Sequence, residues 1–208
     1  MTNDQHSMNT RPASTLSSPD RHGSDRRRWI AWLIHRWPTV LGITIAALAA
    51  FDLDSGTEFT ALVTNLALVY LGAATLDRRW SAWVLLLVGL AVIVLLRLLD
   101  PPVDPVIVLL IIASALLVVG VIGQRRRGSG DVPLQAVGMI VFGGAMLLAL
   151  YVNSTLASYL VAVALLAHAA WDAVHFWRNR VVTRSYAEFC AVLDLLLGVA
   201  ILVVTVTS

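Results

Sequence analysis

The stretch WSAWVLLLVGLAVIVLLRLL, residues Trp80–Leu99, decides the fold because Arg97 is its single charged side chain. Arg78 and Arg79 stand directly before it, and Asp100 follows it. A helix needs about 20 predominantly apolar residues to cross the hydrocarbon core of a bilayer. This stretch has that length and composition, so it predicts a transmembrane helix with an arginine end and an aspartate end on opposite sides of a membrane.

The rest of the chain has the same character. Its 208 residues are 58% hydrophobic and only 13% charged, with a mean hydropathy of +0.79. A soluble domain usually has about 25% charged residues. The apolar surface is therefore too extensive for one small core, and lipid is expected to cover it. The sequence predicts an all-α, polytopic membrane helix bundle.

Seven segments are expected to be transmembrane helices, and they place the transmembrane domain at residues 37–208. The segments are Trp37–Leu53, which is short, Phe59–Leu76, Trp80–Leu99, Val103–Gly123, Val132–Val152, Thr155–Trp177 and Tyr186–Val206. Residues 29–36, rich in tryptophan, are expected to lie along the interface as an amphipathic anchor. Residues 1–28 are polar and lack the apolar core of a signal peptide, so we expect a disordered cytoplasmic tail.

The basic residues indicate the orientation. All 15 are arginines, and all but one lie in the N-terminal segment or in alternate connections between the predicted helices. In those connections they are Arg78, Arg79, Arg125, Arg126, Arg127, Arg178, Arg180 and Arg184. The opposite side has acidic residues instead, namely Asp52, Asp54, Glu58, Asp100 and Asp104. The positive-inside rule therefore predicts an N-terminus in the cytoplasm and a C-terminus outside.

The residue inventory excludes several classes of protein. There is no lysine, so a Schiff base with retinal or pyridoxal phosphate cannot form, and a Walker phosphate-binding loop lacks its lysine. Cys190 is the single cysteine, which excludes an intrachain disulfide and a cysteine-rich zinc site.

A polar cluster lies on the last two predicted helices, within HAAWDAVHFWRNRVVTRSYAEFCAVLD, residues 168–194. His168, Asp172 and His175 follow the helical repeat and fall within an arc of about 60° on one face. Ionisable side chains at membrane depth are costly unless they are paired, and they are candidates for function by default. Any chemistry of this protein is therefore expected at this cluster.

The next helix contributes Cys190 and Asp194, which are four residues apart and share a face. In an antiparallel hairpin, residues at equal depth have residue numbers with a constant sum. The pairs His168–Asp194 and Asp172–Cys190 have the same sum, so the two polar faces are in register if the helices turn towards each other. Glu188 points elsewhere, towards the membrane surface.

Three interpretations of the cluster are open. His168, Asp172, His175 and Asp194 are suitable ligands for zinc or non-haem iron. The same residues could instead pair with one another as a structural lock between two helices. A proton relay, or ligand binding without metal, is the third interpretation.

Catalytic roles are conceivable for three residues of the cluster. Asp172 or Asp194 could act as a general base, and Cys190 as a nucleophile if a neighbouring base generates its thiolate. A buried, inert thiol is the alternative for Cys190. On other helices, Asn65 and Ser114 could line the same cavity or could instead bond to the backbone of a neighbouring helix. Tyr70 is expected to be a wall of the site.

The pattern H-x-x-W-D-x-x-H followed by C-x-x-x-D, residues 168–194, resembles one found in uncharacterised bacterial multi-pass membrane proteins, which implies the extent of a site but no activity. The architecture is similar to that of the progestin and adipoQ receptor and hemolysin III group. Those seven-helix proteins have a zinc site with histidines on their second and seventh helices. This chain has no histidine on either predicted helix, so the similarity is one of architecture alone.

The sequence therefore favours an integral protein of the inner or plasma membrane with a His/Asp site near its cytoplasmic side. If it is an enzyme, we expect a metal-dependent hydrolase of a lipid or a small amphipathic substrate. The alternative is a non-enzymatic protein, a subunit of a membrane complex or a small permease, in which the cluster is a lock. Membrane lipid is the expected partner and nucleic acid is not, while the oligomeric state stays open.

Overall fold

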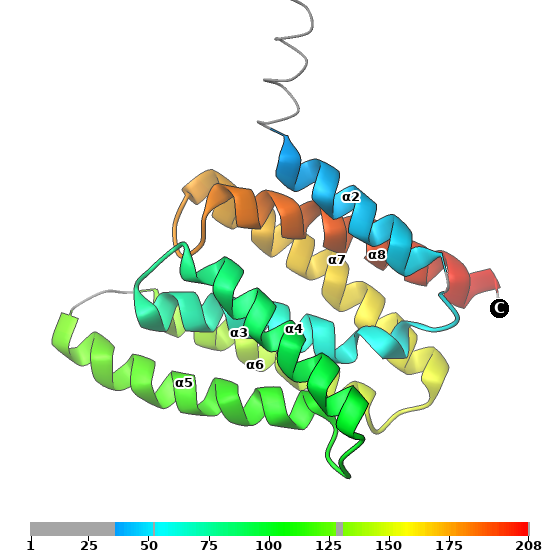
Figure 1. Cartoon of the computed structure of the whole chain (residues 1–208), viewed down its shortest axis with the longest axis horizontal. Coiled ribbons are helices and arrows are strands. Elements are labelled where there is room, and N and C mark those ends of the chain that lie inside the picture. Colours follow the sequence, from blue (N-terminus) through cyan, green and yellow to red (C-terminus); the bar gives the residue numbers. More distant parts are fainter. Residues whose placement is uncertain (1–35, 52, 128–130, 208) are drawn as a thin grey trace, which may run out of the picture. The chain divides into compact units, whose positions relative to one another are not determined.

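The computed structural model describes residues 36–51, 53–127 and 131–207, and helices account for most of them (Figure 1). Within these ranges no β-strand occurs. The elements are α2 (Trp37–Ala50), the 3-10 turn η1 (Gly56–Phe59), α3 (Thr60–Leu76), α4 (Ser81–Leu99), α5 (Pro105–Arg127), α6 (Val132–Ala149), α7 (Ser154–Arg178) and α8 (Arg184–Thr207). The predicted tail and anchor, residues 1–28 and 29–36, lie outside the described residues except for Arg36.

Six helical segments are long and apolar enough to cross a membrane, with η1 and α3 together forming the segment Gly56–Leu76. This confirms the predicted all-helical fold and agrees with helices that cross a membrane. The first predicted segment, Trp37–Leu53, is longer than the helix, because α2 ends at Ala50 and has 14 residues. At 1.5 Å per residue α2 is about 21 Å long, whereas the hydrocarbon core of a bilayer is about 30 Å thick.

Polar residues end or begin several helices. Asp77, Asp100 and Asn179 follow α3, α4 and α7 in the left-handed conformation, which aspartate and asparagine adopt more readily than most residues. Asn153 directly precedes α7, and its side chain accepts a hydrogen bond of 2.9 Å from the backbone amide of Leu156, as a helix N-cap does.

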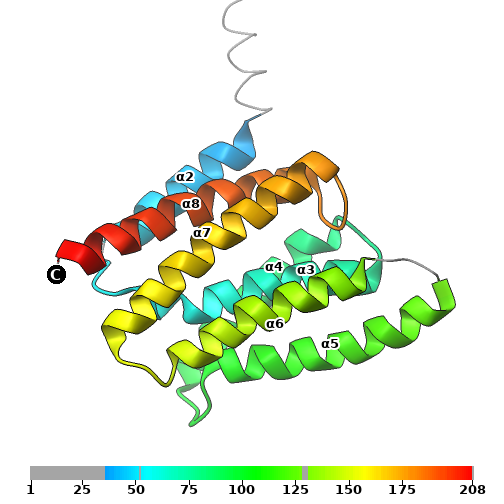
Figure 2. The same ribbon diagram turned by 180° about the vertical axis from the view of Figure 1, so that it is seen from behind.

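The helices differ in how far they are buried. In an apolar stretch of 18 residues within η1 and α3, 72% of the residues are buried, against 22% in each of the corresponding stretches of α4 and α5. α3 packs against α4, α5 and α6, whereas α7 packs most extensively against α8. Both ribbon views show α7 and α8 side by side (Figures 1 and 2). The buried faces of α3, α7 and α8 hold the polar residues described below.

Candidate functional site

The polar face of α7 points into the protein. His168 and Asp172 are 0% exposed and His175 is 4% exposed, so all three predicted positions share a buried face. The residues between them include Val174, which is 40% exposed. The predicted helical repeat of the cluster is therefore confirmed.

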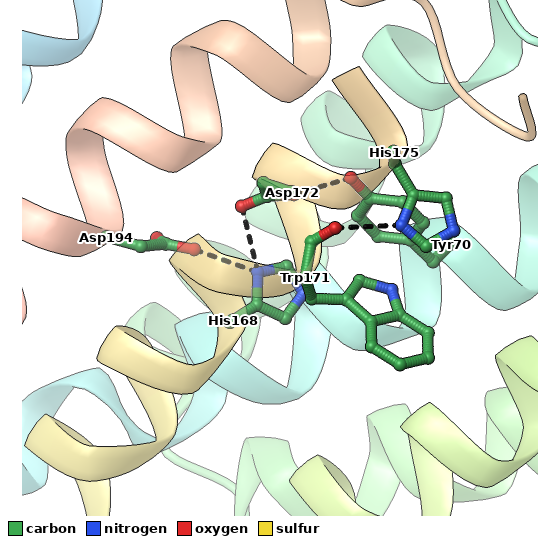
Figure 3. A network of polar contacts seen from close by, with 6 residues as sticks. All are labelled: Tyr70, His168, Trp171, Asp172, His175 and Asp194. Carbon is green, nitrogen blue, oxygen red and sulfur yellow. Dashed lines mark hydrogen bonds and ion pairs between the residues drawn. The ribbon is translucent and has the colours of Figure 1, made fainter. Parts of the chain in front are cut away.

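Helix α8 brings Asp194 to this face. A close approach of the two helices allows it, because a Cβ atom at Gly198 would lie 3.1 Å from the backbone oxygen of Ala162. His168 Nδ1 lies 2.9 Å from Asp194 Oδ2 and 3.2 Å from Asp172 Oδ2. Figure 3 shows the carboxylates of Asp172 and Asp194 both directed at this one imidazole nitrogen. The predicted approach of His168 and Asp194, and with it the hairpin register at this depth, is confirmed.

Tyr70 of α3 completes the contact across three helices. Its hydroxyl donates a hydrogen bond of 2.5 Å to Asp172 Oδ1 (Figure 3). Its ring also meets the ring of His168 edge-on, with centroids 5.6 Å apart. Tyr70, predicted only as a wall of the site, therefore binds one of its carboxylates directly and fixes the orientation of that side chain.

His175 lies apart from the two carboxylates (Figure 3). Its Nδ1 is 2.9 Å from the backbone oxygen of Trp171. A carbonyl oxygen only accepts, so Nδ1 carries the proton, and Nε2 then accepts from the side-chain amide of Gln135, 3.1 Å away. Both imidazole nitrogens thus have partners.

Gln135 of α6 was missed by the sequence reasoning. It is the one amide side chain in the helix VPLQAVGMIVFGGAMLLA, and it is 1% exposed. A buried amide in a membrane helix needs a hydrogen-bond partner, and this need was the signal that could have found it. Its partner could not be read from the sequence, because α6 and α7 meet only in the folded protein.

Three other residues singled out in the sequence, Cys190, Glu188 and Asn65, make no hydrogen bond to His168, Asp172 or Asp194 within the described residues. Cys190 is a free, fully buried thiol, and no bond joins it to Asp172 in the described part of the chain. Glu188 accepts a hydrogen bond from Thr39 of α2, so it points towards α2 and not into the cluster, while its predicted direction towards the membrane surface stays a prediction. Asn65 donates to the backbone oxygen of Leu86, 3.3 Å away, which is the helix-to-helix bond that the sequence left as one alternative.

His168, Asp172 and Asp194 form a group suited to a cation. One ligand atom from each lies within 4.8 Å of the others. Within the described residues, Asp194 Oδ1 and His168 Nε2 have no hydrogen-bond partner, although buried polar atoms nearly always have one. An imidazole with two carboxylates is a mixed nitrogen and oxygen ligand set, which zinc and iron both accept.

Known proteins give no independent identification of this site. No protein-family model, curated protein or solved structure matches the chain. The resemblance of residues 168–194 to other membrane proteins therefore stays a prediction, and the interpretation of the site depends on its geometry.

Proposed function

We propose that this chain is a multi-pass membrane protein that binds a divalent cation, zinc or iron, through His168, Asp172 and Asp194. The observation that carries the proposal is the position of one imidazole nitrogen between two fully buried carboxylates. Such a nitrogen has at most one proton to share between them. A cation coordinated by all three side chains would satisfy the two carboxylates together.

Charge balance supports the proposal. In the described part of the chain, His168 is the ion-pair partner of both carboxylates, and neither carboxylate pairs with an arginine. Two ionised aspartates with one neutral histidine have a net charge of minus two, which is very unfavourable in a fully buried site. A divalent cation neutralises this charge completely.

The distances also suit a cation. Zinc binds nitrogen and oxygen ligands at about 2.0–2.2 Å, so neighbouring ligands of a tetrahedral site are about 3.4 Å apart. The separations of 2.9 and 3.2 Å need to lengthen by only a few tenths of an ångström. Tyr70, by donating to Asp172 Oδ1, would leave Asp172 Oδ2 directed at the cation.

Hydrolysis of an ester or amide is the activity that we propose for this centre. Bound there, the cation would polarise a carbonyl and acidify a water molecule. Of this chain's own residues, Asp172 or Asp194 could accept the proton of that water. Since His168 and both aspartates are 0% exposed, catalysis requires α7 and α8 to separate from α3 far enough to admit a lipid or small amphipathic substrate.

A structural lock is the second candidate function, favoured by the same burial. The distances of 2.9 and 3.2 Å fall in the range of ordinary hydrogen bonds. A protonated imidazole between two aspartates, one of them also protonated, would be neutral without any metal. This arrangement would join α7 to α8 and would have no catalytic role.

For the membrane orientation, we propose that the N-terminus is cytoplasmic and that α2 is a seventh span, around which the bilayer thins locally because the helix is only about 21 Å long. One face of α2 packs on α8, since Gly42 lies against the backbone of Phe189. Ile43, Leu48 and Phe51 are exposed and need lipid around them. The alternation of arginines between the connections requires the same odd number of spans.

The metal content of the purified protein tests the proposal. The protein is isolated in detergent without chelators, loaded with zinc or iron, and freed of excess metal. We expect about one cation per chain. A protein that stays metal-free after both loadings would exclude the metal centre and leave the structural lock.

A further inference from the structure

A second polar site lies at the end of the bundle where the α3–α4 turn, the start of α6 and the α7–α8 loop meet. A hollow of about 300 Å³ opens there, a volume at the lower end of the range of about 300–1,000 Å³ for small-molecule pockets. Its polar wall consists of Asp77, Arg78, Arg79, Asp131 and Arg180. None of these residues belongs to the proposed metal centre.

The hollow has three arginines against the two aspartates Asp77 and Asp131, so its net charge of plus one favours an anion. Arg180 pairs with Asp131 at 2.9 Å, in an exposed ion pair. Arg78 and Arg79 have no ion pair in the described part of the chain, so two guanidinium groups remain available. Guanidinium groups bind phosphate oxygens through paired, charge-assisted hydrogen bonds.

Residues next to Arg78 and Arg180 have an unusual backbone conformation, with positive φ angles. Asn179 and Val181, on either side of Arg180, have φ angles of 48° and 70°, and Asp77, before Arg78, has 53°. Val181 is β-branched and buried, and such a residue rarely adopts a positive φ. Strained backbone that the surroundings maintain is often associated with binding sites, and Val181 lines this hollow.

Orientation in the membrane does not explain this arrangement. The positive-inside rule requires arginines in certain connections, but not their convergence on one hollow from two separate connections. A second hollow of similar volume, about 290 Å³, follows α4 and has the opposite balance, with Arg97 beside Asp100 and Asp104. There the guanidinium of Arg97 already donates to the backbone oxygen of Glu58 at 2.7 Å.

We propose that the hollow of Arg78, Arg79 and Arg180 binds a phosphate group, presented by a lipid headgroup or by a free phosphate compound. Arg78 and Arg79 bind the phosphate oxygens, and Arg180 joins them when it leaves Asp131. The carboxylate of Asp131 therefore competes with the phosphate for Arg180.

Calorimetric titration of the full-length protein in maltoside micelles, which contain no phosphate, tests this proposal. The titrants are inorganic phosphate, dioctanoyl phosphatidic acid and, as a matched control, dioctanoylglycerol, which has the same chains without phosphate. We expect saturable binding of phosphatidic acid and none of dioctanoylglycerol. Binding of inorganic phosphate as well would indicate a free phosphate compound, and its absence a lipid headgroup.

Three variants locate the binding. R78Q/R79Q removes two charge-assisted contacts and should weaken binding at least about tenfold. D131N removes the competing carboxylate and should tighten binding, a gain that misfolding cannot imitate. R97Q, in the other hollow, should have no effect. Absence of saturable binding of both phosphate ligands, equal binding of dioctanoylglycerol, or equal losses in R97Q and R78Q/R79Q would overturn the proposal.

Discussion

The two histidines of α7 lie on the same buried face but have different surroundings. His168 is in contact with two carboxylates, and its Nε2 has no hydrogen-bond partner among the described residues. His175 has partners at both nitrogens, Gln135 and the carbonyl of Trp171. Their difference comes from other helices, because α8 supplies a carboxylate opposite His168 and α6 supplies an amide opposite His175. A shared helix face therefore does not make two residues members of one site.

Replacement of His168 should have the largest effect. In H168A the two buried carboxylates lose their common partner, so we expect complete loss of bound cation and destabilisation by about 3–5 kcal/mol. Metal analysis and thermal unfolding measure the two effects. D194N, which is nearly isosteric, is the matched variant for the case that H168A does not fold. Retention of a full equivalent of metal in D194N would contradict the assigned ligand set.

Replacement of Tyr70 should have an intermediate effect. Y70F removes the hydrogen bond to Asp172 Oδ1 and preserves the ring that packs against His168. A residue that orients a ligand typically changes metal affinity by about 10–100-fold, so we expect weaker binding with unchanged stoichiometry. Competition with a chromophoric chelator measures the affinity. An unchanged affinity would show that Tyr70 does not orient Asp172.

Replacement of His175 should leave the cation in place. H175A deprives neither carboxylate of its partner. It leaves the buried amide of Gln135 without its partner, at a cost of about 1–3 kcal/mol. We therefore expect a lower unfolding temperature with the metal content of the parent protein. Loss of the cation in H175A, in protein that is still folded by circular dichroism, would restore the four-ligand site predicted from the sequence.

Replacement of Cys190 should have the smallest effect. The thiol is fully buried and is not among the three grouped ligands, so C190A should keep both its metal and any hydrolytic activity. A loss of activity with unchanged metal content would instead support Cys190 as the nucleophile. The measurement is turnover of an ester substrate by metal-loaded parent and variant.

The helices and their faces were predictable because they depend on local properties. Long apolar segments identify the spans, and the helical repeat places His168, Asp172 and His175 on one side. The register of α7 and α8 followed from their short connection, since an antiparallel hairpin fixes which residues share a depth.

The partners of the site depend on contacts between helices that are distant in sequence, and these were only partly predictable. Tyr70 was predicted near the site but not as a hydrogen-bond donor to Asp172, and Gln135 was missed. The end of α2 at Ala50 was also missed, because the apolar residues Phe51 and Leu53 continue the hydrophobic pattern beyond the helix. Hydropathy alone does not show at which residue the hydrogen-bonded turns of a helix end.

X-ray absorption spectroscopy of the zinc-loaded protein tests the central claim most directly. Outer-shell scattering from imidazole rings counts the histidines bound to the metal, and the first shell gives the ligand distances. We expect one imidazole with oxygen ligands, at about 2.0–2.2 Å, and the same spectrum for H175A. Two imidazoles per zinc in the parent protein, or zinc without any bound imidazole, would contradict a site built from His168, Asp172 and Asp194.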